Sequence, residues 1–193
     1  EADCKAMIEA AKRSGAKLMI AYRLHCEPGT LDMIERVHAG HFGDPRLFTS
    51  TFTQRVKPGN HRAQNGFAAG PVPDMGPYPL NMVRQLFNAE PIEVSAVGVH
   101  SPGSILQTWD TVTVSLRFPE ERLAQFTVSY TLPDTERFQL LGTEGEIEAS
   151  PCFGYGEGVA ISYRATIGGE TRVHVNPIVD QFAGETAYFS DCI

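Results

Sequence analysis

Two residues that could perform acid–base chemistry lie four positions apart at the start of a predicted helix. Residues 73–81 read PDMGPYPLN, and the apolar run MVRQLF follows. Prolines 77 and 79 suit a first helical turn, and Asp74 lies where its carboxylate can cap free backbone donors. On such a turn Asp74 and Tyr78 share a face, and the helix dipole favours the negative charge that a proton-accepting phenol develops. An ordinary Asp cap with a Tyr packed beneath it is the alternative.

A long polar segment leads into this pair. Residues 56–73, about 18 in number, are too rich in Gly, Pro and polar side chains for a helix or strand, and loops of that length in a compact chain are usually functional or disordered. The segment carries hydrogen-bond donors suited to a hydroxyl-rich ligand, namely Lys57, Asn60, His61, Arg62, Gln64 and Asn65. A solvated surface loop is the alternative interpretation.

Four short segments in chain order carry a family resemblance. They are residues 17–28 (KLMIAYRLHCEP), 43–48 (GDPRLF), 74–81 (DMGPYPLN) and 90–94 (EPIEV). Together they resemble the C-terminal domain of the glucose-fructose oxidoreductase/inositol dehydrogenase (Gfo/Idh/MocA) family, with a match from about Met7 to Ile193. In that family an N-terminal Rossmann domain binds NAD or NADP, and the C-terminal domain supplies the substrate site and much of the subunit interface.

The resemblance implies roles for individual residues. It assigns acid–base catalysis to Tyr78 and substrate orientation to Asp74, as in the glucose-fructose branch of the family. It further implies substrate contacts from Arg23, Arg62 and Asn81, and contacts near the nicotinamide from Tyr22, Arg23 and His25. For the segment around Arg23, an interdomain hinge with a buried arginine is an equally good interpretation.

The nucleotide half of such an enzyme is missing from this sequence. No G-x-G-x-x-G motif occurs in the 193 residues, and the Gly-rich stretch 154–158 lies among strand signals. The Glu-Lys-Pro motif of the family, whose lysine contributes to catalysis, is also missing. We therefore expect NADP or NAD to bind the longer protein, with NADP slightly favoured by the resemblance, and we expect neither to bind this chain alone.

The two ends of the chain suggest a piece of a longer protein. Residues 3–14 have helical periodicity and lead into the apolar run 18–22, which predicts a buried parallel strand. We interpret residues 1–22 as the last helix and strand of an upstream Rossmann domain. Residues 23–179 are then the substrate-binding and oligomerisation domain, and residues 180–193 are a C-terminal helix that stops without a cap.

The region between the ends predicts an α+β fold. A helix is expected over residues 30–39, and alternating or continuous apolar runs predict strands over residues 46–54, 92–99, 108–118, 122–130, 137–141, 146–149, 159–167 and 171–175. Turn signals join consecutive strands into hairpins, so we expect an open, mostly antiparallel sheet with helices on one face. The resemblance implies a fold like the C-terminal domain of glyceraldehyde-3-phosphate dehydrogenase.

The second face of that sheet is expected to pack against another subunit. Apolar residues between Ile92 and Tyr130 occupy both strand parities, for example Val94 and Val97, so an uncovered face would carry apolar side chains. The resemblance favours face-to-face packing of two sheets. We therefore expect a homodimer or homotetramer.

Composition excludes several classes of function. The net charge of −7 and the pI near 5.3 argue against nucleic-acid and anionic-membrane partners, and no apolar run is long enough to span a membrane. The four cysteines form no metal or redox motif, which favours reduced thiols in a cytoplasmic protein, although a signal peptide could precede residue 1. Glu35, His38 and His41 have ligand chemistry, but Gly40 separates the two histidines, and we expect no metal site.

These observations favour one function over a second. The chain is expected to be the substrate-binding and catalytic half of an NAD(P)-dependent oxidoreductase that transfers hydride to or from a sugar or polyol carbon. The alternative is a non-catalytic ligand-binding or dimerisation domain with the same fold.

Overall fold

The computed structural model describes residues 2–64, 69–156 and 159–193, and its centre is one eight-stranded sheet. The strand order is β2-β3-β4-β1-β5-β6-β7-β8. The strands are β1 (Pro45–Thr53), β2 (Glu93–Val99), β3 (Thr111–Phe118), β4 (Arg122–Ser129), β5 (Thr135–Gly142), β6 (Gly145–Ala149), β7 (Tyr163–Ile167) and β8 (Glu170–His174). Neighbouring strands pair antiparallel, except that β1 and β4 are parallel. The predicted open, mostly antiparallel sheet is confirmed.

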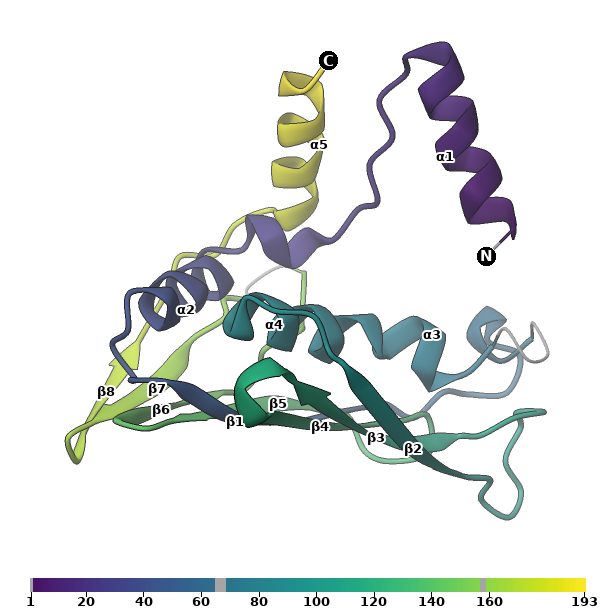
Figure 1. The fold of residues 1–193 in the computed structure, drawn as a ribbon. Coiled ribbons are helices and arrows are strands. Elements are labelled where there is room, and N and C mark those ends of the chain that lie inside the picture. Colours follow the sequence, from purple (N-terminus) through teal and green to yellow (C-terminus); the bar gives the residue numbers. More distant parts are fainter. Residues whose placement is uncertain (1, 65–68, 157–158) are drawn as a thin grey trace.

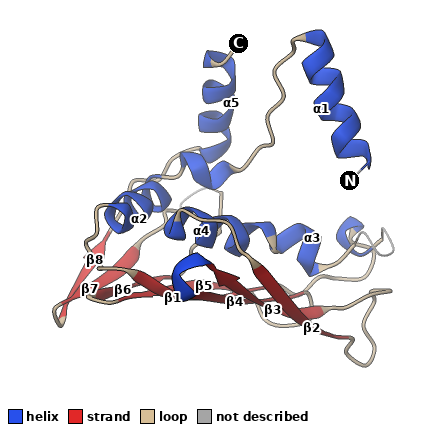
Figure 2. Ribbon diagram, in the orientation of Figure 1, coloured by secondary structure: helices blue, strands red, loops and turns tan. Residues whose placement is uncertain are grey.

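The helices that touch the sheet lie on one of its faces (Figures 1 and 2). They are α2 (Pro28–His38), α3 (Pro71–Met75) and α4 (Pro77–Phe87), while α1 (Ala2–Ser14) and α5 (Gln181–Asp191) rise away from that layer. Short 3-10 turns lie at Arg23–Cys26 (η1), His61–Ala63 (η2) and Pro119–Glu121 (η4). The arrangement matches the predicted α+β class.

Strand alternation places the core between the sheet and α4. Val112, Val114 and Leu116 of β3 are buried, whereas the intervening threonines and serine face the other side. The α4 side chains Met82, Val83, Leu86 and Phe87 are buried against this face, and the Phe87 ring meets the Phe118 ring edge-on at 5.1 Å. Burial of apolar side chains is the main favourable term in folding, so this layer holds α4 against the sheet.

The open face of the sheet carries many polar side chains. Its side chains include Thr49, Thr51, Thr113, Gln125, Thr127, Gln139, Glu148 and Arg164. Exposed apolar side chains on it are found at Val97 and Val99 of β2, at Leu123 of β4 and at Val173 of β8. Most large apolar residues of β3 and β4 point toward the helices, and the packing of the open face against another subunit stays a prediction.

The predicted buried strand at residues 18–22 does not form. This segment is irregular and links α1 to η1, and Leu18 and Ile20 are exposed. A parallel strand needs hydrogen-bonding neighbours on its edges, and the described part of the chain offers it none. Helix α1 forms as predicted, but it buries no residue. Helix α5 also forms, with Asp180 as its N-cap: its carboxylate accepts hydrogen bonds from the backbone N–H groups of Phe182 and Ala183.

Two negative observations apply to the described residues. None of the described helices combines the length and the apolar composition needed to cross a bilayer. No group of three or more His, Cys, Asp or Glu side chains among them is arranged to hold a metal ion.

His38 has a structural contact instead. Its Nε2 atom lies 2.7 Å from the backbone oxygen of Gln85, which anchors α2 to α4.

Candidate active site

A cavity of about 570 Å³ lies where β1 ends and β5 begins. Its charged and phenolic lining includes Arg23, Arg62, Asp74, Tyr78, Asp134 and Glu136. Four of these six were predicted from the sequence as site residues. Segments far apart in the chain therefore meet at one concave surface with convergent polar groups, which is the usual form of a small-molecule site.

The Asp74 and Tyr78 pair is positioned by two consecutive helices instead of one. Asp74 lies inside the short α3, and Gly76 separates it from α4, whose first turn carries Pro77 and Tyr78. The predicted N-cap role of Asp74 is wrong, because no side chain caps α4. Gly76 is required at this junction, since a Cβ there would lie 2.4 Å from the backbone oxygen of Val72. The segment 56–73 is correspondingly less irregular than expected, because it contains η2 and the start of α3.

The Asp74 carboxylate is held by two donors from other elements. The Tyr130 hydroxyl, directly after β4, donates to Asp74 Oδ2 at 2.6 Å, and Arg62 Nε donates to the same oxygen at 3.1 Å. Arg62 belongs to η2, whose N-cap Asn60 accepts from the Arg62 backbone N–H at 2.9 Å. The predicted substrate residue Arg62 thus contacts Asp74 and lines the cavity. Of the other predicted donors, Asn65 lies outside the described residues.

The Tyr78 ring sits in an aromatic cluster. Its neighbours are Phe52 at 5.5 Å, Tyr22 at 5.7 Å and Phe153 at 5.9 Å between ring centroids. These rings fix the plane of the phenol, and Phe52 and Phe153 line the cavity with it. No described residue makes a hydrogen bond to the Tyr78 phenol oxygen, whereas the Tyr78 backbone carbonyl accepts from the Tyr22 hydroxyl at 3.0 Å. The arrangement leaves the phenol oxygen available to a ligand.

Arg23 is buried, and its donors are engaged within the chain. Its Nη1 donates to the Gln181 side chain at 2.7 Å and to the Gly154 carbonyl at 2.9 Å, and its Nη2 donates to the Phe153 carbonyl. The guanidinium also lies 5.0 Å from the Tyr78 ring centroid and 4.6 Å from that of Tyr155. Arg23 therefore joins η1, α5 and the 153–155 segment at the cavity wall.

Two other predicted site residues differ in their surroundings. The Asn81 side-chain oxygen accepts from Arg84 Nη1 at 2.9 Å, and Asn81 is not among the residues that line the cavity. Burial raises the pKa of the Tyr22 phenol, so this residue stays protonated and donates to Tyr78. The structure thus brings Arg23, Arg62, Asp74 and Tyr78 together and leaves Asn81 outside.

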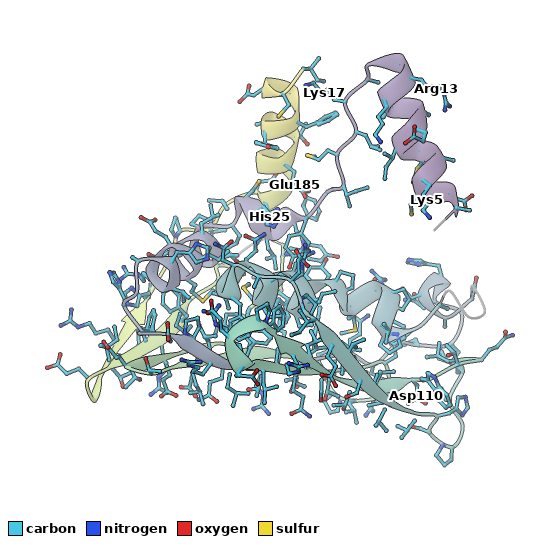
Figure 3. The ribbon with its side chains drawn as sticks, in the orientation of Figure 1. Lys5, Arg13, Lys17, His25, Asp110 and Glu185 are labelled. Atoms are coloured by element: carbon cyan, nitrogen blue, oxygen red, sulfur yellow. The ribbon has the colours of Figure 1, made fainter. Side chains whose placement is uncertain are left out.

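His25 lies at the foot of α5, close to Glu185 (Figure 3). Its ring meets the Tyr22 ring edge-on at 4.7 Å. Burial lowers the pKa of His25, and the nearby Glu185 carboxylate partly opposes that shift. Tyr22 and Arg23, the other two residues predicted to face a cofactor, donate hydrogen bonds within the chain. The ring nitrogens of His25 have no hydrogen bond with the described residues.

The sequence analysis missed Glu136, which lines the cavity, and Tyr130, which contacts Asp74 without lining it. Glu136 at the start of β5 accepts from the Phe153 backbone N–H at 2.7 Å, and burial raises the pKa of its carboxyl while that hydrogen bond and Arg23 oppose the shift. Nothing in the local sequence distinguishes Glu136. Tyr130 had a weak signal, because it ends the buried stripe of Ala124, Phe126 and Val128 with a ring that carries a polar tip.

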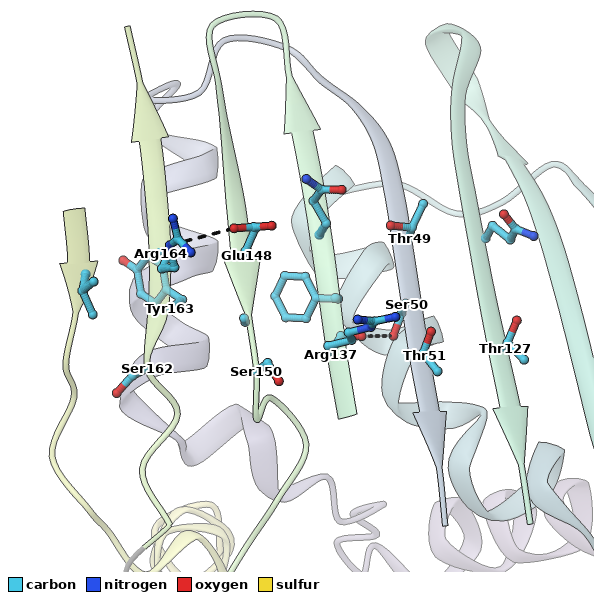
Figure 4. Close-up of a pocket in the computed structure, with 15 residues that line it drawn as sticks. Thr49, Ser50, Thr51, Thr127, Arg137, Glu148, Ser150, Ser162, Tyr163 and Arg164 are labelled. Atoms are coloured by element: carbon cyan, nitrogen blue, oxygen red, sulfur yellow. Dashed lines mark hydrogen bonds and ion pairs between the residues drawn. The ribbon is translucent and has the colours of Figure 1, made fainter. Parts of the chain in front are cut away.

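A larger hollow of about 740 Å³ lies on the open face of the sheet (Figure 4). Its polar lining includes Thr49, Thr51, Thr127, Arg137 and an Arg164–Glu148 pair at 4.0 Å. It contains neither Asp74 nor Tyr78. We place the candidate active site at the smaller cavity, because only that one combines an acid–base pair with aromatic walls.

Comparison with known proteins identifies the family. The C-terminal domain model of the GFO/IDH/MocA family matches residues 30–148. The chain belongs to this family of oxidoreductases. This confirms the resemblance drawn from the four sequence segments.

Individual relatives agree with the family assignment. The D-xylose 1-dehydrogenase [NADP(+)] of Haloarcula marismortui is 28% identical over 195 residues, which cover 97% of this chain and 53% of that protein. Aldose-aldose oxidoreductase from Caulobacter crescentus, solved with glycerol, superposes with a TM-score of 0.89 at 29% identity, over 99% of this chain and 58% of that one. A 3-ketoreductase from Actinomadura kijaniata, solved with NADP and TDP-benzene, shares the fold with a TM-score of 0.84 at 22% identity, over 98% and 58% of the two chains. The chain thus spans about half the length of these relatives.

Among the described residues, most of those predicted to face a nicotinamide cofactor are engaged within the chain. The sequence has no G-x-G-x-x-G turn to hold a pyrophosphate, and the Tyr22 hydroxyl and the Nη1 and Nη2 donors of Arg23 are spent on internal hydrogen bonds. Of Tyr22, Arg23 and His25, the three residues predicted to lie near the nicotinamide, His25 still has ring nitrogens that could contact the cofactor. The donor set therefore fits the edge of a cofactor at most and does not fit its phosphates.

Proposed function

We propose that this chain is the substrate-binding and catalytic half of an NAD(P)-dependent oxidoreductase that acts on a CH–OH group of a sugar or polyol. The observation that carries the proposal is the convergence of Asp74 and Tyr78 on one cavity in a member of the GFO/IDH/MocA family. The hydride acceptor is held by a part of the protein outside this chain. NADP is favoured over NAD because the xylose dehydrogenase relative uses NADP.

Tyr78 is assigned the proton-transfer step. Its phenol oxygen has no partner among the described residues, and its ring is fixed by Phe52 and Phe153, so the oxygen can meet a substrate hydroxyl in a defined direction. In the reductive direction the Tyr78 phenol gives its proton to the carbonyl oxygen as the carbonyl carbon gains a hydride. In the oxidative direction the resulting tyrosinate takes the hydroxyl proton back as the hydride leaves the same carbon. A positioned acid–base group of this kind contributes about 100-fold to 10,000-fold in rate.

Asp74 is assigned the orientation of the substrate. A carboxylate accepts hydrogen bonds from hydroxyl groups, and charge-assisted bonds of this type are the stronger ones. Glu136 and Asp134 line the same cavity and extend its acceptor set, while Arg62 adds donors. This mixture suits a hydroxyl-rich ligand, because each hydroxyl can donate to one carboxylate and accept from a neighbouring donor.

The proposal is tested by replacing Tyr78 in the full-length protein that contains this chain. Tyr78→Phe removes the proton acceptor and keeps the ring, so kcat for D-xylose with NADP should fall by about 100-fold or more, with a smaller change in NADP affinity. Initial rates from pH 6 to 9 measure the effect.

Tyr188→Phe on the exposed face of α5 serves as the matched control and should keep wild-type turnover. Thermal unfolding should be unchanged in Tyr78→Phe, because no described residue bonds to the phenol oxygen. Near-normal turnover of Tyr78→Phe across the pH range would remove Tyr78 from the proton-transfer step. A wild-type protein that neither binds nor converts aldoses would favour the non-catalytic ligand-binding or dimerisation alternative.

A further inference from the structure

The carboxylate of Asp74 is coordinated asymmetrically. Tyr130 and Arg62 both donate to Oδ2, at 2.6 and 3.1 Å. No described residue donates to Oδ1. One oxygen of the carboxylate is thus saturated by the protein, and the other is left without a protein partner in a residue that lines the cavity.

A second cluster of the same three residue types provides a comparison. The Tyr163 hydroxyl donates to Asp32 Oδ2, and Arg36 Nε donates to Asp32 Oδ1 at 2.8 Å. Both oxygens of Asp32 are therefore satisfied within the fold. The two ion pairs are similarly exposed, with side-chain exposures of 35% and 36% for Arg62 and Asp74 and of 33% and 30% for Arg36 and Asp32. A difference in burial therefore does not explain why Asp74 Oδ1 has no hydrogen-bond donor while both oxygens of Asp32 have one.

Tyr130 is held firmly in the fold. Only 2% of the residue is exposed, and its backbone N–H donates to the Asp110 carbonyl at 2.9 Å while its carbonyl accepts from the Val56 N–H at 3.0 Å. Burial and the hydrogen bond to Asp74 both raise the pKa of the Tyr130 phenol, so it remains a donor at neutral pH. A rigid donor from the sheet thus meets a carboxylate carried by the short helix α3.

We propose that Tyr130 is a positioning residue that locks the Asp74 carboxylate so that Oδ1 alone accepts a hydroxyl of the sugar or polyol substrate. The inference rests on the proposed function. Arg62, which belongs to η2, donates to the same Oδ2 atom and helps to hold the carboxylate in this orientation. The free energy of a charge-assisted hydrogen bond is then directed to one substrate hydroxyl, which makes the site specific for a ligand that donates at that position.

The test uses the full-length protein with NADP and D-xylose as the probe. Tyr130→Phe should raise KM for D-xylose about tenfold while kcat changes by less than about threefold, because the variant loosens Asp74 and leaves Tyr78 in place. Asp74→Ala should raise KM further. The double variant should match Asp74→Ala alone, since Tyr130 acts only through Asp74.

Tyr163→Phe is the matched control, because it removes the same hydroxyl from the other cluster. It should lower the melting temperature and leave KM unchanged. Arg62→Ala should also raise KM for D-xylose. Because the Arg62 side chain is partly exposed, this variant can be measured if Tyr130→Phe folds poorly.

Two results would overturn the positioning role. One is a wild-type KM in both Tyr130→Phe and Arg62→Ala, and the other is a double variant whose KM effect is the product of the two single effects. Failure of the wild-type protein to bind or convert any aldose would instead overturn the proposed function, and this inference with it.

Discussion

The two tyrosine–aspartate–arginine clusters show how one set of residues serves two purposes. At Asp32 the donors are distributed over both carboxylate oxygens, and His174 Nδ1 approaches Oδ2 at 3.9 Å as well. At Asp74 both donors converge on a single oxygen, and the remaining one lies in a residue of the cavity wall. When both oxygens of a carboxylate accept hydrogen bonds within the fold, as in Asp32, the group has a structural role. When one oxygen has no donor in the fold, as in Asp74, that oxygen can accept a hydrogen bond from a ligand.

The two clusters also differ in the elements that they join and in whether they face the cavity. Asp32 joins α2 to β7 and β8, where the His174 ring stacks on the Tyr163 ring at 4.6 Å. Asp74 joins α3 to η2 and to the end of β4, next to the aromatic wall around Tyr78. The first cluster therefore holds elements together, and the second also faces a space that a ligand can enter.

The largest expected difference between the clusters comes from paired Asp→Asn substitutions. In the full-length protein Asp74→Asn should lower kcat/KM for D-xylose by about 30-fold or more, because an amide is a weaker hydroxyl acceptor than a carboxylate. Asp32→Asn should leave kcat/KM within about twofold. Both variants should lose a similar stability of about 1–2 kcal/mol, since each weakens one charge-assisted network around a tyrosine hydroxyl.

Steady-state kinetics and urea unfolding measure the two quantities separately. Equal losses of kcat/KM in the two variants would show that Asp74 has no special relation to the substrate. A stability loss confined to Asp74→Asn would contradict the structural role given to Asp32.

A smaller effect concerns acid and the Asp32 cluster. Burial lowers the pKa of His174, the neighbouring Arg36 and Arg172 lower it further, and Asp32 partly opposes them, with Tyr163 stacked against the ring. The folded protein thus binds a proton on His174 less readily than the unfolded chain, whose histidine pKa is about 6.5. Stability should fall as the pH drops below that value.

His174→Phe keeps a stacking ring and removes the titration. Between pH 7.5 and 5.5 the melting temperature of the wild-type chain should drop by roughly 2 °C more than that of His174→Phe. Differential scanning calorimetry gives the comparison, and His25, whose pKa is also lowered, remains in both proteins as an internal reference. An equal drop in both would remove His174 from the acid response.

The sheet and most of the site could be predicted because their signals are local. Alternation along β3 and β4 gives the strand positions and the buried face, and proline at position 77 marks the start of α4. Asp74 and Tyr78 are neighbours in sequence, so their meeting at one cavity needed no long-range information. The family resemblance supplied their roles, which the residues alone left open.

The features that sequence analysis missed depend on contacts between distant segments. Tyr130 meets Asp74 across 56 positions, and Arg23 meets Phe153 across 130. Apolar content alone predicted a strand at residues 18–22, although strand formation also needs hydrogen-bonding neighbours that the described part of the chain lacks.

A crystal structure of the full-length protein with NADP and D-xylose would test the proposed roles of Asp74 and Tyr78 most directly. We expect one sugar hydroxyl within hydrogen-bond distance of Asp74 Oδ1 and another at the Tyr78 phenol oxygen, with Tyr130 and Arg62 still on Oδ2. Sugar bound only in the hollow on the open face of the sheet, or an Asp74 carboxylate turned away from the sugar, would contradict these roles.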